Sequence, residues 1–209
     1  MRLPKRDHYE LARDAALRRL REGWDADRLS ALQARLLDEG RTVALPVLCW
    51  RLEVCLEPYA MRVLPDGREA GITWQILALN YLGARQPAPP RGLRSLADFA
   101  EGRGYEKAFE GRVIGRLSRT AGRDRESLAR AAERLGAVPT GHDPMRCMFR
   151  FFPLLEFQVS RYEGDEDFPA SCSVLFSDNL LSLFSMEDGI VAAERLVAAL
   201  EGKTPVAGK

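Results

Sequence analysis

The sequence predicts an α+β fold, with a mainly antiparallel sheet of about five strands, helices packed against it and an N-terminal helical hairpin. Three observations lead to this prediction. Apolar and polar residues alternate over 48–57 and again over 145–159, which is the period of half-buried strands. Apolar residues follow the helical period over 11–20 and 190–200. Strands and helices occur in blocks rather than in strict alternation, and this order is typical of antiparallel sheets.

Residues 1–40 are predicted to form the helical hairpin, packed on the main domain. Asp7 and Glu10 make an acidic form of the capping box at the start of the first helix. Asp25 or Asp27 caps a second helix, which Gly40 ends. The apolar side chains of this second helix repeat with the helical period: Leu29, Leu32, Leu36 and Leu37.

Residues 41–201 are predicted to form a single α+β domain, which starts with a β-hairpin over 48–63. Residues 72–82 are apolar almost all round, so they are predicted to be a helix buried on several sides. Residues 83–92 contain three prolines and form a surface connection. This connection is too short to establish a domain boundary.

The second half of this domain is predicted to contain helices followed by strands. Short helices fill 95–136, with capping residues at Ser95 and Asp124. The strands that follow are expected at 145–152, 155–159 and 171–177, and a helix capped by Ser185 comes after them. Residues 202–209 are predicted to be a flexible tail.

The composition is that of a folded globular protein whose net charge attracts no particular partner. Of 209 residues, 46% are hydrophobic, and 31 basic against 30 acidic side chains give a formal charge of +1. No long-range field of one sign therefore draws in nucleic acid or an anionic membrane. The first twenty residues lack the apolar stretch of an export signal, and no window reaches the ~20 apolar residues of a membrane span. We expect a cytoplasmic protein that binds neither nucleic acid nor membranes; its oligomeric state stays open.

Motifs that would identify a catalytic site are weak or missing. The four cysteines form no Cys-x-x-Cys pair, and no Gly-x-Ser-x-Gly nucleophile motif occurs. Gly102-Arg103-Gly104 lacks the third glycine of a dinucleotide loop. His142 and Asp143 could form an oriented general base, but Asp143 more naturally closes a turn between the neighbouring prolines. The sequence assigns no catalytic residue, cofactor or metal site.

An acidic turn between two apolar runs is the most informative feature. Asp165, Glu166 and Asp167 follow Gly164 and precede Phe168-Pro169, so the segment is predicted to be the tip of a β-hairpin. Such acids could hold a hard cation or meet a partner. In the competing interpretation, Asp165 closes the turn through backbone N–H groups, the next two acids are solvated, and Phe168-Pro169 anchors the loop in the core.

This turn also carries a resemblance to a known family. Residues 162–169, read Tyr-Glu-Gly-Asp-Glu-Asp-Phe-Pro, together with 74–82, Leu175-Phe176 and Glu187-Asp188, resemble an uncharacterised prokaryotic family, domain of unknown function 3786. Its members show an aromatic-x-Gly-Asp-Glu-Glu-Phe-Pro turn, so Asp167 replaces the usual Glu here. The resemblance covers roughly 43–200 and implies no activity. Because some relatives are joined to iron-sulfur modules in anaerobes and methanogens, it implies redox or one-carbon metabolism.

Three hypotheses about function follow. In the favoured one, the protein is a non-catalytic binding or accessory module that serves an iron-sulfur or corrinoid protein in anaerobic metabolism. Its contact surface would be the acidic tip with its neighbour Arg161, and the candidate binding residues are Tyr162, Asp165, Glu166, Asp167 and Asp143.

Two alternatives stay open. A metal-assisted hydrolase or transferase would use Asp143, Asp165, Glu166 and Asp178 as oxygen ligands. A carrier of a planar or apolar small molecule would hold its ligand between sheet and helices, in a pocket lined by Trp50, Trp74 and phenylalanines.

Overall fold

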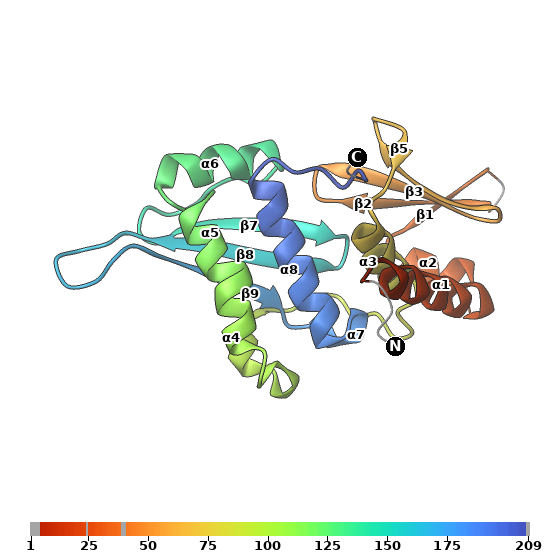
Figure 1. The fold of residues 1–209 in the computed structure, drawn as a ribbon, viewed down its shortest axis with the longest axis horizontal. Coiled ribbons are helices and arrows are strands. Elements are labelled where there is room, and N and C mark those ends of the chain that lie inside the picture. Colours follow the sequence, from red (N-terminus) through yellow and green to blue (C-terminus); the bar gives the residue numbers. More distant parts are fainter. Residues whose placement is uncertain (1–4, 24, 39–40, 208–209) are drawn as a thin grey trace.

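The computed structural model describes residues 5–23, 25–38 and 41–207 and confirms the α+β fold (Figure 1). The strands form two antiparallel sheets, one of five strands and one of four, where the sequence predicts a sheet of about five. No helix in the described part of the chain is both long enough and apolar enough to cross a membrane.

The first sheet is an antiparallel meander in chain order. Its core strand β3 buries Leu52 and Val54 on one face, as the alternation predicts, and Val54 lies opposite Val43 on one side and Met61 on the other. The strands of this sheet are β1 (Arg35–Leu37), β2 (Thr42–Val47), β3 (Trp50–Leu56), β4 (Tyr59–Leu64) and β5 (Arg68–Glu69).

The second sheet has the order β6-β9-β8-β7, and all its neighbours are antiparallel. β7 and β8 form a tight hairpin, and β8 and β9 form a long one that ends in the acidic turn. The strands are β6 (Leu93–Arg94), β7 (Met145–Phe152), β8 (Leu155–Tyr162) and β9 (Ser171–Ser177).

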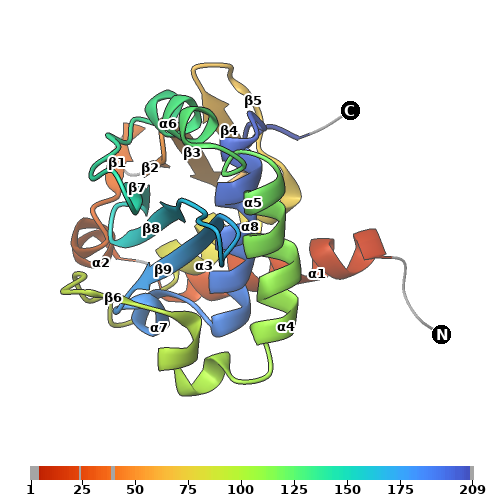
Figure 2. The same cartoon turned by 90° about the vertical axis from the view of Figure 1, so that its left-hand side faces the viewer.

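Helices cover the sheets. A helical run from α4 to α5, interrupted by a π-helical turn at Glu110–Ile114, lies beside α8 on one face of the second sheet, as Figures 1 and 2 show. On the other side of the molecule α1 packs against α3. The helices are α1 (Lys5–Gly23), α2 (Ala26–Ala31), α3 (Ile72–Leu82), α4 (Glu106–Phe109), α5 (Gly115–Arg119), α6 (Arg125–Arg134), α7 (Leu180–Leu183) and α8 (Met186–Leu200), with 3-10 turns at Leu96–Asp98 and Ala100–Gly102.

The N-terminal segment differs from the predicted helical hairpin in its second half. Asp25 caps α2 as predicted, but the helix ends at Ala31, and Gln33 adopts a left-handed backbone conformation with φ 55°. Leu36 and Leu37 then lie in β1, which pairs with β2. Pairing with a neighbouring strand has overridden the helical period of the leucines. Gly40, the predicted helix end, lies outside the described residues.

The chain end also differs from the predicted flexible tail. The Gly71 N–H donates to the Pro205 carbonyl at 2.8 Å, and the Ala207 N–H donates to the Glu69 carbonyl at 2.8 Å. Residues 205–207 therefore lie along β5 and the start of α3. Residues 208–209 lie outside the described part.

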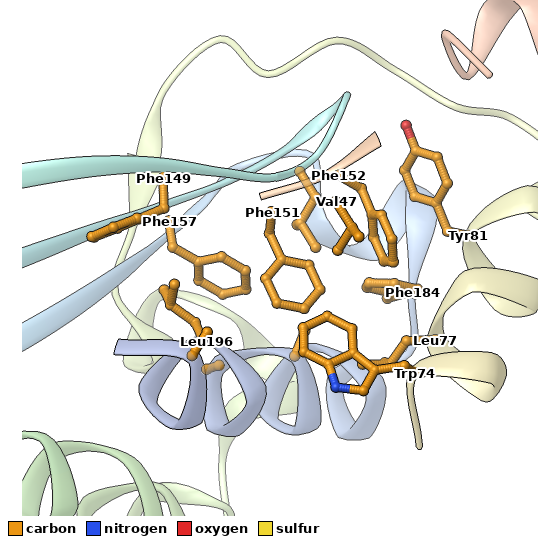
Figure 3. Packing of buried hydrophobic residues seen from close by; sticks show 14 of the residues in the cluster. Val47, Trp74, Leu77, Tyr81, Phe149, Phe151, Phe152, Phe157, Phe184 and Leu196 are labelled. Carbon is orange, nitrogen blue, oxygen red and sulfur yellow. The ribbon is translucent and has the colours of Figure 1, made fainter. Parts of the chain in front are cut away.

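One contiguous hydrophobic core joins the two sheets (Figure 3). Phe151 of β7 is fully buried and stacks on Trp74 of α3, with ring centroids 5.3 Å apart and planes 11° apart. It also contacts Phe152 and Phe157 edge-on, at 5.0 and 5.6 Å. These aromatic residues belong to the core, and α3 is the buried helix that the sequence predicts.

Candidate functional site

The β8–β9 hairpin extends beyond the body of the protein and carries the acidic turn at its end (Figure 1). The strand pairing ends at Tyr162 and Ser171, and residues 163–170 between them are all exposed. We refer to residues 163–170 as the hairpin tip.

Asp165 closes the hairpin tip through the backbone. Its Oδ1 accepts hydrogen bonds from the N–H of Asp167 at 3.0 Å and of Phe168 at 2.8 Å, and its own N–H donates to the Phe168 carbonyl at 2.9 Å. This is the Asx-type turn that the sequence predicts as one interpretation. A Cβ on Gly164 would lie 2.7 Å from the Ala170 nitrogen, so the turn requires glycine there. The tip therefore has a closed, defined backbone, and the carboxylate of Asp165 is committed to it.

A buried arginine holds the base of the hairpin tip. Arg161 is only 6% exposed, and it donates from Nε to the Gly122 carbonyl at 3.2 Å and from Nη2 to the Arg123 carbonyl at 3.4 Å. Its Nη1 lies 2.5 Å from Oε2 of Glu163 as an ion pair without the alignment of a hydrogen bond. Arg161 is thus a structural anchor, and its expected place on the contact surface is wrong.

Asp143 lies at the same base, on the segment that leads into β7. Its Oδ1 accepts a hydrogen bond from the Glu163 N–H at 3.2 Å, so the structure brings this predicted residue to the hairpin tip. The neighbouring His142 offers its backbone carbonyl, not its ring, to Arg125. No hydrogen bond joins His142 to Asp143 among the described residues, so the geometry does not form the oriented base considered from the sequence.

Asp178, the fourth acid of the metal hypothesis, lies elsewhere. It follows β9 at the end opposite to the hairpin tip, and its Oδ1 accepts from the Arg91 N–H at 2.9 Å. That hydrogen bond is the main reason why the pKa of Asp178 lies below its ordinary value. Across the described ranges, no three His, Cys, Asp or Glu side chains are placed to hold one metal ion. The four acids do not converge.

The exposed ring of Phe168 is the feature that sequence reasoning missed, whereas Tyr162 is exposed as a predicted binding residue should be. Phe168 is 71% exposed and Tyr162 is 41% exposed, so the expectation that Phe168-Pro169 anchors the loop in the core is wrong. No signal in the sequence separates an exposed Phe-Pro from a buried one. The structure therefore presents an aromatic ring beside Glu166 and Asp167, both of which are solvent-exposed.

The carrier hypothesis required a pocket lined by Trp50, Trp74 and phenylalanines. Trp74 borders a pocket of about 890 Å³ between the starts of α1 and α3 and residues 202–207, but neither Trp50 nor any phenylalanine lines it. The phenylalanines of β7 and β8 fill the core instead. The predicted combination of residues is not brought together.

The buried cysteines offer no activated nucleophile. Burial raises the pKa of Cys147 to about 11 and also raises the pKa of Cys172. Both thiols therefore stay protonated at neutral pH, and both are buried in the core. Cys172 donates weakly to the Gly122 carbonyl, at 3.6 Å, beside the Arg161 anchor.

Comparison with protein families gives a match that covers most of the chain. Residues 26–199 match the model of a family described as Domain of unknown function (DUF3786). No curated protein and no solved structure matches the chain.

Proposed function

The chain belongs to the domain-of-unknown-function family DUF3786, and on that premise we propose that it is a non-catalytic binding module whose hairpin tip docks onto a partner protein. The observation that carries this proposal is the exposure of Phe168, 71%, on a tip whose backbone is closed by Asp165. A large ring left in water has a cost that burial in a partner recovers. Because the tip is already ordered, docking requires little further loss of conformational freedom.

The chemistry of the tip defines the kind of partner. Phe168 would insert into an apolar pocket, and Tyr162 would add a flat contact with a polar end. Glu166 and Asp167 directly precede Phe168 and are exposed, so the pocket should be bordered by lysine or arginine side chains. Such charges at the rim mainly increase the rate of association and select the partner.

We further propose that this partner is an iron-sulfur or corrinoid protein of the cytoplasm. This class follows from the resemblance to prokaryotic relatives joined to iron-sulfur modules, and the acidic tip supports a partner with a basic surface. A catalytic role has less support, since Asp165 and Asp143 already accept backbone hydrogen bonds and Asp178 lies at the other end of β9.

Native mass spectrometry of the protein purified without oxygen from its own host tests this proposal. With the wild type we expect a stoichiometric partner that carries metal or corrinoid, and with Phe168→Ala we expect at least a tenfold lower yield of that complex. The double variant Glu166→Gln, Asp167→Asn should slow association and weaken its dependence on salt.

Val138→Ala is the matched control, because Val138 is an exposed apolar side chain, 79% exposed, on the segment after α6. It should leave the complex unchanged. The tip is not the docking surface if the complex forms unchanged with Phe168→Ala. The same conclusion holds if Val138→Ala lowers the yield of the complex as much as Phe168→Ala does. A partner without metal or corrinoid would leave the docking site standing and reject the partner class.

A further inference from the structure

We propose that a second site, a pocket between α1, α2, α3 and the α7–α8 corner, binds a small molecule through its phosphate or carboxylate group. The pocket has a volume of about 560 Å³. The helices α1, α2 and α3, which contribute to its lining, lie at the end of the molecule away from the hairpin tip (Figure 1), so this proposal is independent of the docking function. Three arginines from different parts of the chain line it: Arg19, Arg28 and Arg85.

A chain of hydrogen bonds fixes the first arginine. Nη2 of Arg19 donates to Oδ1 of Asn80 at 3.0 Å, and Nδ2 of Asn80 donates to Oδ1 of Asp188 at 3.1 Å. Oδ2 of Asp188 in turn accepts from the Ser185 hydroxyl at 2.8 Å. The amide of Asn80 is therefore oriented by both neighbours. Because an amide oxygen carries no charge, the guanidinium of Arg19 keeps its full positive charge and its remaining N–H donors for a ligand.

The second arginine is partly buried and has an unused donor. Nε of Arg28 is shielded from solvent and has no hydrogen-bond partner within the described structure. The guanidinium lies against Gly23, where an added Cβ would be 3.4 Å from Nη2. A buried N–H without an acceptor costs free energy that an oxyanion ligand would recover. The unused donor thus points to a ligand with acceptor atoms.

The three arginines also share the lack of an ion-pair partner. Within the described ranges, no carboxylate lies within 4.0 Å of Arg19, Arg28 or Arg85. Arginines elsewhere do form ion pairs: Arg13, Arg51, Arg112, Arg116, Arg123, Arg130, Arg150 and Arg161.

The charge of the pocket lining selects an anion. Two carboxylates, Glu22 and Asp188, also line the pocket, so three guanidiniums leave a net charge of +1. Asp188 is already engaged by Ser185 and Asn80. Guanidinium groups bind phosphate and carboxylate through paired N–H donors, so both chemistries suit this lining. The volume is sufficient for a small metabolite.

Calorimetric titration of the full-length protein with inorganic phosphate and, separately, with succinate tests the site. We expect a dissociation constant below about 1 mM for at least one of them at low salt, and at least tenfold weaker binding in Arg28→Gln and in Arg85→Gln. Raising the chloride concentration should weaken binding progressively. The anion that binds more tightly identifies the group that the site recognises.

Arg68→Gln is the control, because Arg68 is exposed on β5 and does not line the pocket. It should bind like the wild type. Arg85 is exposed, so Arg85→Gln keeps the test valid even if Arg28→Gln perturbs folding. The proposal would be overturned if neither anion bound to the wild type. It would also be overturned if Arg68→Gln weakened anion binding as much as Arg28→Gln and Arg85→Gln do.

Discussion

At the scale of single residues, buried Arg161 determines whether the hairpin tip is held in one place. A charge that is 6% exposed is tolerated because two backbone carbonyls and Glu163 compensate it. The same two carbonyls, of Gly122 and Arg123, belong to the turn between α5 and α6. Arg161 therefore holds the base of the β8–β9 hairpin against the helical layer. The position of the hairpin tip, which carries the exposed ring of Phe168, depends on this contact.

Replacing Arg161 by methionine should destabilise the protein. The buried Gly122 carbonyl would keep only the weak Cys172 donor, and the Arg123 carbonyl would lose its donor from Arg161, so we expect the free energy of unfolding to fall by about 2–4 kcal/mol. Glu163→Gln should cost less than about 1 kcal/mol, because the Glu163 side chain is 40% exposed. Urea denaturation at pH 7 measures both changes. Wild-type stability in Arg161→Met would mean that the guanidinium is not the anchor of the hairpin.

The burial of Arg161 and the turn made by Asp165 could be predicted from the sequence, but the exposure of Phe168 could not. The two-residue period of β8 places Arg161 on the same face as Phe157 and Val159, so its burial could have been read from the alternation. The turn made by Asp165 is local, since its side chain bonds the backbone two and three residues on, and it was predictable for that reason. The exposure of Phe168 depends on how far the hairpin extends beyond the sheet, and no local pattern carries that information.

At the scale of elements, signals that act within a few residues predicted the structure well. Asp25, Asp124 and Ser185 each accept a backbone hydrogen bond at the start of a helix, as their positions predict. Strand β1 was not predicted, because its three residues adopt the strand conformation through their pairing with β2. A short strand of this kind has no period of its own, and the leucines that precede it satisfy the helical pattern.

The contact between α5 and the end of α8 should make stability depend on pH. Arg116 donates to both carboxylate oxygens of Glu201, the C-terminal cap of α8, at 2.6 and 2.5 Å. This hydrogen bonding is the main reason why the pKa of Glu201 lies below its ordinary value. A carboxyl group with a lowered pKa in the folded state contributes stability above its unfolded pKa of about 4.3, and this is lost as the pH falls through the folded pKa.

We therefore expect Arg116→Gln to lower the free energy of unfolding by about 1–2 kcal/mol at pH 7, and by less below pH 4. Urea denaturation between pH 3 and pH 7 measures this difference. Arg112→Gln is the control, because Arg112 is 68% exposed and lies 3.6 Å from Glu194; its effect should be small at every pH. A deficit in Arg116→Gln that stays constant with pH would show that Glu201 does not titrate against Arg116.

At the scale of the whole molecule, the fold class was predictable and the division into two sheets was not. Alternation tells which face of a strand is buried, but it does not tell which strands are neighbours. The junction between the two sheets depends on contacts between residues far apart in the chain, such as the hydrogen bond from the Leu48 N–H to the Phe151 carbonyl at 3.1 Å. The same holds for the pocket that Arg19, Arg28 and Arg85 line, here called the arginine pocket, whose lining comes from α1, α2, α3 with the segment after it, and the α7–α8 corner.

The shared core predicts that residues 41–201 unfold as one cooperative unit. Phe151 is one of the side chains that join the second sheet to α3, through its stacking on Trp74; Phe152 stacks on Tyr81 of the same helix. Phe151→Ala should leave a cavity and lower the free energy of unfolding by about 3–5 kcal/mol. In native-state hydrogen exchange, the most protected amides of β3 and of β8 should lose protection by the same amount, because both sheets open together.

Met148→Ala supplies the comparison, since Met148 lies on the same strand but is 43% exposed, and it should change neither set of amides appreciably. If Phe151→Ala lowered the protection of β8 alone, the two sheets would be separate units and the single-domain prediction would fail. If the amides of β3 and β8 lose protection together, this has a consequence for both proposed sites. Since the arginine pocket uses α3 and the docking hairpin belongs to the second sheet, an anion bound in the pocket would then stabilise the body that carries the hairpin tip.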